Sequence, residues 1–274
     1  MKIQISKDDF EQSILAATSS HSEVFESVEK HFEESYQRLS RQILGEVGEE
    51  ALETSGELRV AVIKVVCLDA FLGVVRHLDL VLTPTGFGVV ANNEVSPASS
   101  SRVEALIEQC RVALIVAQDT VMSHLTDVPG WGSTLQAQQG IQTVVWSMEG
   151  YCYLTRQTSM TSKDWMSKLA AMQEADATLR RLVSDEQMDD IMCLVRGVRE
   201  GNEFEGSVRL MLSRCLIMLA NDMLSLANER ARLLRYFDAH LDEFPLYANS
   251  SAYKANHFKE FKNEKSKPAF VFNS

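Results

Sequence analysis

Apolar residues recur every three or four positions through most of this chain, and that spacing constrains its fold more than any other feature. The clearest run lies between Ser22 and Gly48 and contains Val24, Val28, Phe32, Tyr36, Leu39, Ile43 and Val47. Steps of three and four place these side chains on one face of a helix, and Glu and Lys fill the other face. The sequence therefore predicts a mainly α protein, a multi-helix bundle with long antiparallel helices.

Further helices are predicted over residues 7–17, 57–81, 98–125, 162–183, 185–199 and 205–243. Ser6 and Asp9 form a capping-box pattern at the start of the first of these. The last would be roughly 55–60 Å long if it were unbroken. Residues 135–153 are ambiguous, because Ile141–Trp146 has strand propensity whereas Gln136–Gln139 favours helix. We favour helix there.

Minor β structure is predicted at three places. Lys2–Ile5 alternates in polarity and could form an edge strand. Thr83-Pro84 ends a helix, because the residue before a proline is pushed out of helical geometry, and the following Gly86–Val90 segment is expected to be extended. Ala269–Phe272 has β character at the other end of the chain.

The domain organisation follows from loops and prolines. Residues 1–245 are predicted to form a single helical domain, with a possible sub-boundary near residues 127–133, where Val128-Pro129-Gly130-Trp131-Gly132 is the clearest loop. Phe244-Pro245 stops the last long helix. Residues 246–274 are then expected to form an extended C-terminal tail.

The formal net charge of −11 argues against a protein that coats nucleic acid, since neutralising phosphates needs clustered Lys and Arg. The charge is uneven: residues 1–57 hold 13 acidic and 5 basic residues, whereas residues 254–267 hold 5 Lys and 2 Glu. Two interpretations stay open. The charges belong to solvated surfaces, or opposite ends of neighbouring subunits attract each other.

The sequence predicts no enzyme, cofactor or metal site. Its five cysteines are irregularly spaced without a CxxC pair, which is typical of small buried hydrophobes in a reducing compartment. His240 and Glu243 have the i,i+3 spacing of di-iron bundles, but we identify no partner glutamates for them. There is no phosphate loop and no GxSxG motif.

No membrane association is predicted either. The most apolar stretch, Val60–Leu82, is interrupted by five ionisable residues, which disfavours a bilayer span. Met1–Phe10 lacks the apolar core of a signal peptide.

Two segments are predicted to mediate interactions. Gly86-Phe87-Gly88 is either a tight turn anchored by its aromatic ring or a loop that contacts a partner. At the other end, Phe270-Val271-Phe272 follows a basic, proline-broken linker, so it folds back on its own domain, adds as a strand to a neighbouring subunit, or stays disordered. The predicted interaction residues are Thr83, Pro84, Phe87, Lys265, Lys267, Phe270, Val271 and Phe272.

Both segments also carry a resemblance. Leu82–Val90, with Val95–Ser99 and Arg102–Glu104 after it, and the tail from Tyr253 to Phe272 resemble an uncharacterised family of proteins encoded in phages and prophages of Bacteroidetes, near portal and capsid genes. The resemblance implies a structural virion protein, assembled in the host cytoplasm.

Within that class, helical proteins with extended termini look like head–tail connector (adaptor) subunits. The resemblance thus implies a homo-oligomeric ring on the portal protein, in contact with neck or tail proteins, with DNA only as non-specific passing cargo. The alternative is a non-virion helical assembly chaperone or regulator. A third hypothesis is a metal-dependent enzyme on a helical bundle.

Overall fold

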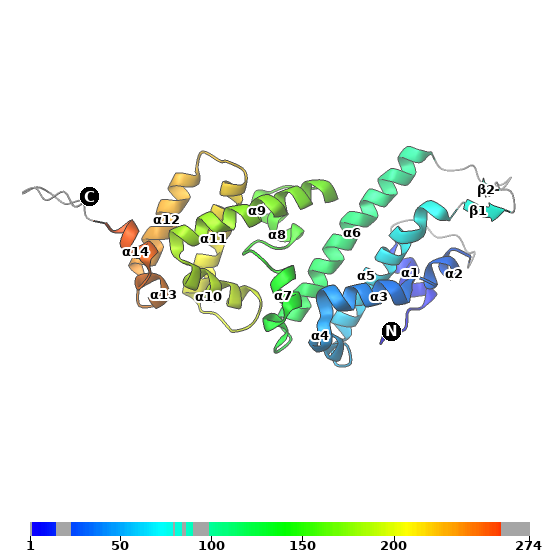
Figure 1. Cartoon of the computed structure of the whole chain (residues 1–274), viewed down its shortest axis with the longest axis horizontal. Coiled ribbons are helices and arrows are strands. Elements are labelled where there is room, and N and C mark those ends of the chain that lie inside the picture. Colours follow the sequence, from blue (N-terminus) through cyan, green and yellow to red (C-terminus); the bar gives the residue numbers. More distant parts are fainter. Residues whose placement is uncertain (1, 15–22, 79, 84–85, 90–98, 259–274) are drawn as a thin grey trace, which may run out of the picture.

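A computed structural model describes residues 2–14, 23–78, 80–83, 86–89 and 99–258, and it confirms a mainly α protein. The chain forms two lobes joined at a waist (Figure 1). The first lobe, residues 2–126, contains α1 (Lys7–Ser13), α2 (Glu23–Glu29), α3 (Phe32–Leu39), α4 (Gly45–Ala51), α5 (Gly56–Val74), the strands β1 (Leu80–Thr83) and β2 (Gly86–Val89), and α6 (Ser100–Thr126).

The waist, residues 127–147, contains a 3-10 turn (Trp131–Ser133) and α7 (Leu135–Gly140). The second lobe, residues 148–258, contains α8 (Met148–Thr155), α9 (Ser162–Val183), α10 (Asp185–Val195), α11 (Glu203–Ala220), α12 (Leu226–Ala239), α13 (Pro245–Ala248) and α14 (Ser251–Asn256). The β1–β2 hairpin lies at one extreme of the long axis and α14 lies near the other (Figure 1).

Helix α5 is the central helix of the first lobe. Leu58, Val62, Val66 and Leu68 are completely buried, because the helix is apolar around most of its circumference and is packed by α1, α3 and α6. It ends at Val74 and not near Val81 as predicted. The next residues form a 3-10 turn in which the charged side chains are exposed, so the apolar face that sustains the helix stops there.

The predicted helix from Ser22 to Val47 is divided. Its apolar positions from Val28 to Ile43 are buried as expected, but α2 and α3 are separated at Lys30-His31 and a π-helical turn, Ser40–Leu44, precedes α4. Gly45 has a φ of 62°, a conformation that glycine adopts without steric cost. The bend orients the carbonyl of Ile43 towards the waist.

The single long helix predicted over residues 205–243 is wrong. α11 ends at Ala220, the chain turns through Asn221-Asp222, and α12 packs back against α11. The Asn221 side chain donates to the Ile217 carbonyl at 2.7 Å, and Asp222 adopts a φ of 49°. Asn and Asp favour turns because their side chains compete with the helical hydrogen bonds.

Other boundaries also differ from the sequence predictions. The capping box of Ser6 and Asp9 is confirmed, but α1 ends at Ser13. No strand forms at Lys2–Ile5, where Ile3 and Ile5 are buried in irregular backbone. Residues 141–147 of the ambiguous segment are irregular and lie between α7 and α8.

The chain beyond Pro245 is helical before any tail can begin. α13 and α14 occupy residues 245–256, so an extended tail from residue 246 is wrong for that part. Tyr247 is fully buried and its ring lies 4.6 Å from that of Phe237. The predicted strand at Ala269–Phe272 lies outside the described residues.

Candidate interaction surface

The interaction residues predicted from sequence fall into two groups. Thr83 lies at the end of β1 and Phe87 lies in β2, where the antiparallel register pairs Thr83 with Gly86 and Leu82 with Phe87. The structure therefore places both on one hairpin. The remaining six lie outside the described residues: Pro84, Lys265, Lys267, Phe270, Val271 and Phe272.

Side chains with the chemistry of metal ligands do not converge in the described part of the chain. Within it, no group of three or more His, Cys, Asp or Glu could hold a metal ion. His240 packs against Phe204 and Tyr236, and the Glu243 carboxylate accepts a hydrogen bond from the Asn202 amide. The i,i+3 pair is thus part of the packing between α11 and the end of α12.

The cysteines behave mainly as small apolar residues. Cys67, Cys110 and Cys215 are completely buried, and burial raises the pKa of the Cys67 and Cys215 thiols to about 12. These two thiols therefore stay protonated at neutral pH.

No helix among the described residues has the length and apolarity needed to cross a bilayer.

Two carboxylates of helix α6 accept hydrogen bonds from the second lobe and so connect the two lobes. Glu108 accepts hydrogen bonds from the backbone N–H and the hydroxyl of Ser162 at 2.7 and 3.0 Å, at the start of α9. Asp119 accepts from the backbone N–H of Met148 at 2.8 Å, at the start of α8. The two acids are about three helical turns apart and so share one face of α6. Each faces the positive end of a helix dipole.

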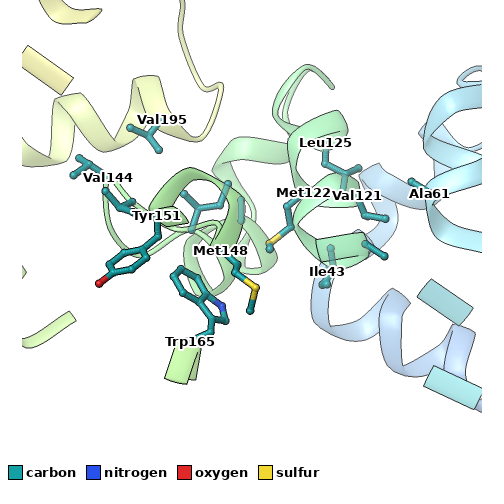
Figure 2. Close-up of a cluster of buried hydrophobic side chains, with 14 of the residues drawn as sticks. Ile43, Ala61, Val121, Met122, Leu125, Val144, Met148, Tyr151, Trp165 and Val195 are labelled. Atoms are coloured by element: carbon teal, nitrogen blue, oxygen red, sulfur yellow. The ribbon is translucent and has the colours of Figure 1, made fainter. Parts of the chain in front are cut away.

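The Asp119 site is buried, and burial raises the pKa of this carboxyl from 3.8 to about 7. The Met148 N–H favours the charged form, but removal of the carboxyl from water outweighs it. The waist holds one cluster of buried apolar side chains, which includes Ile43 and Ala61 of the first lobe and Val195 of the second (Figure 2). The waist is therefore a packed core.

Close backbone contacts complete the waist. The indole N–H of the completely buried Trp131 donates to the Ile43 carbonyl at 2.9 Å. Gly197, with a φ of 74°, lies against Thr126 so closely that a Cβ there would be 1.8 Å from the Thr126 carbonyl oxygen. The end of α10 thereby touches the end of α6.

A cavity of about 750 Å³ opens beside this contact, between the end of α6 and the α10–α11 connection. Arg199 on its wall is paired with Asp190 at 2.6 Å and Glu205 at 2.5 Å. Arg209 also lines the cavity, and no acidic side chain pairs with it in the described part of the chain. Burial alone lowers the pKa of its guanidinium.

Arg209 also lines a groove between α8 and α11, which we call the α8–α11 groove. It consists of two hollows of about 310 and 430 Å³ that share Leu154. Its walls are largely apolar and include Val144, Val145, Leu154, Ile217 and Met218.

Arginine supplies the charge of the α8–α11 groove. Arg209 lines one hollow and Arg214 lines the other, and no described Asp or Glu lines either. Arg214 reaches Glu229 only at 3.7 Å. In a chain with a net charge of −11, a groove with two arginines and no carboxylate is suited to an acidic, apolar ligand.

Exposed apolar side chains border the same groove. Tyr153 is 85% exposed, Leu210 is 44% exposed and Met223 is 46% exposed, and all three line it. Leu224, in the adjoining α11–α12 turn, is fully exposed. Arg, Tyr and Met are enriched at protein interfaces, so this composition is typical of a protein-binding surface.

Sequence reasoning did not identify this groove. It assigned one apolar face to the last long helix, and Val208, Leu212 and Cys215 of that face are buried as expected. Leu210 and Ile217 lie on a second face. This second apolar face, which lies beside Arg209 and Arg214, was the sequence signal for the groove. The other wall of the groove is α8, most of which lies in the segment whose secondary structure the sequence did not determine.

Comparison with known protein families places part of the chain. Residues 29–140 match a protein family described as "Family of unknown function (DUF6712)". No curated protein and no solved structure matches the chain. The matched segment runs from the end of α2 through α7, so it covers most of the first lobe and part of the waist, whereas the α8–α11 groove lies outside it.

Proposed function

We propose that this chain is a structural subunit of a tailed-phage particle, a head–tail connector (adaptor) that assembles with copies of itself into a ring on the portal protein. The phage assignment rests on the resemblance of Leu82–Val90 and Tyr253–Phe272. The family match to residues 29–140 is compatible with it and names no function.

The observation that carries the assembly part is the exposed apolar border of the α8–α11 groove. Tyr153, Leu210, Met223 and Leu224 face solvent around one groove of a single chain. Contiguous apolar surface of this kind marks protein-binding sites on soluble proteins. A subunit whose assembled form covers this surface accounts for it.

Two further properties suit a connector. The continuous core through the waist (Figure 2) keeps the lobes in one orientation, which a ring under load from packaged DNA requires. The net charge of −11 would repel DNA phosphates, so DNA could pass a ring of such subunits without adhering.

The proposal is tested by mixing the full chain with portal protein and measuring the mass of the complex by native mass spectrometry. We expect a ring of many copies of the chain on each portal assembly. We also expect the chain in purified particles at a comparable copy number. A chain that neither binds portal protein nor occurs in particles would favour the assembly chaperone or regulator instead.

A further inference from the structure

We infer that the α8–α11 groove is the docking site for the acidic α4–α5 corner of a second copy of this chain. By the α4–α5 corner we mean Glu53, Glu57 and Val60. In this arrangement, which rests on the proposed ring assembly, Val60 meets the apolar floor of the groove, and Glu53 and Glu57 meet Arg209 and Arg214.

The groove provides half of the argument. It combines apolar walls with two arginines and lacks carboxylates among its described lining residues. Arg209 is half-buried and has no acidic partner in the described part of the chain, whereas Arg180 and Arg199 each contact at least two carboxylates. A guanidinium withdrawn from water gains most from a carboxylate that arrives with a partner.

The corner provides the other half. Val60 is 68% exposed, and no other large apolar side chain described in the first lobe is as exposed. Glu57 is exposed beside it and Glu53 is exposed in the preceding turn, and the described residues provide no ion pair for either. Val60 lines a hollow with Glu57, Lys64 and His124, and Glu53 lies in the turn before α5. The corner thus presents an apolar side chain and two acids to a groove of apolar walls and two arginines.

The corner is also held in one conformation before any partner arrives. Ser55 caps α5 by accepting a hydrogen bond from the Leu58 N–H, and the Arg59 guanidinium donates to the Leu52 carbonyl at 2.7 Å. Little backbone conformational entropy is therefore lost when the corner binds.

Charge also selects this occupant over the C-terminal segment of the chain. Residues 259–274 contain four Lys and two Glu, so their net positive charge would meet Arg209 and Arg214. The first 57 residues, in contrast, hold 13 acidic and 5 basic residues. An acidic partner surface is available in every copy of the chain.

The two surfaces are different patches on different lobes, so each copy could use both at once. A contact of this heterologous type generates a ring if its rotation closes and an open filament if it does not. The inference thereby specifies how neighbouring subunits of the proposed ring touch.

Charge reversal tests the contact in the full chain. The groove variant is R209E/R214E and the corner variant is E53R/E57R. We expect the wild type to self-associate in sedimentation-velocity experiments and each variant alone to associate at least tenfold more weakly. A 1:1 mixture of the two should self-associate about as strongly as the wild type, because each unchanged corner meets an unchanged groove and each reversed corner meets a reversed groove.

Two more proteins separate misfolding from loss of the contact. The four-fold variant, R209E/R214E/E53R/E57R, should recover self-association, since the charges are exchanged across the interface. Tyr153→Glu, at a side chain that is mostly exposed, should weaken association without unfolding the chain. As a matched control, R230E/E174R changes exposed charges elsewhere and should associate like the wild type.

The inference is overturned if the wild type stays monomeric at high concentration, if either double variant alone associates like the wild type, or if the mixture associates as weakly as its two components. These outcomes differ from failure of the proposed function. A chain that still forms portal-bound rings with either charge reversal alone would remain a connector with a different contact. A chain that self-associates through the groove but never binds portal protein would have the contact without the connector role.

Discussion

At the scale of single residues, the carboxyl groups of α6 show how a few side chains fix the arrangement of the lobes. Glu108 and Asp119 each reach the first turn of a helix in the other lobe, and their environments differ. Glu108 is partly exposed, whereas Asp119 is buried and has a pKa of about 7. Asp119 is therefore the group at which pH acts on the waist.

The buried carboxyl makes stability depend on pH in a defined direction. The pKa of Asp119 is raised in the folded chain, from 3.8 to about 7, so the folded state holds a proton that the unfolded state releases. This contribution to stability is fully present below about pH 4 and is lost as the pH rises to about 7. Asp119→Asn keeps an oxygen that can accept from Met148 and cannot titrate.

We expect the free energy of unfolding of Asp119→Asn, relative to wild type, to increase between pH 4 and pH 7 by up to about 4 kcal/mol, the equivalent of the shift in pKa. Urea unfolding at a series of pH values measures this difference. Parallel pH profiles for the two proteins would mean that the carboxyl is not protonated in the folded waist.

At the scale of elements, local signals predicted where helices begin better than where they continue. The capping box of α1 and the bounds of α9 follow from the sequence, because both depend on neighbours within one turn. The division into α11 and α12 was missed although Asn221-Asp222 marked it, since the apolar spacing continues across the turn. The packing of α12 back against α11 sets the position of this turn, and local sequence signals do not report such long-range packing.

The end of α10 gives a test at the same scale. Gly197→Ala places a methyl group 1.8 Å from the Thr126 carbonyl oxygen at a φ of 74°, so backbone on both sides of the waist must move. We expect a loss of about 3 kcal/mol in the free energy of unfolding, the upper end of the usual cost of overpacking or of a strained backbone.

Gly206→Ala in α11 is the matched control. A Cβ there would meet no atom within 4 Å, and alanine favours helix over glycine by about 1 kcal/mol. Thermal unfolding should therefore show a lower Tm for Gly197→Ala and an unchanged or higher Tm for Gly206→Ala. Equal effects of both substitutions would contradict the close contact.

At the scale of the whole molecule, the two lobes share one core, and the sequence did not show whether they form one domain or two. The loop at Val128–Gly132 suggested a boundary, and the chain does turn there. However, Trp131 in that loop is completely buried and donates to the Ile43 carbonyl of the first lobe, and Gly132 lies against the Arg196 carbonyl of the second. The fold class was predicted from periodicity alone. The α8–α11 groove was not, because it needs the relative placement of two helices that are distant in sequence.

The shared core predicts a single cooperative unfolding transition. Trp131, Trp146 and Trp165 lie at the waist or beside it, so tryptophan fluorescence reports on the junction, whereas far-UV circular dichroism reports on helices throughout. Urea transitions from the two probes should coincide. A fluorescence transition that precedes the loss of helix would show that the lobes unfold separately.

Because α6 is packed from both sides, its folding has a consequence during synthesis. The helix is about 40 Å long, and its Glu108 and Asp119 contact α9 and α8, which leave the ribosome later. Until then a nascent chain lacks the Met148 N–H from which the buried Asp119 carboxylate accepts, and a fragment limited to residues 29–140 would lack it permanently. Such a fragment would also lose Phe10, whose ring packs 6.4 Å from that of Phe71. Expressed alone, it should aggregate.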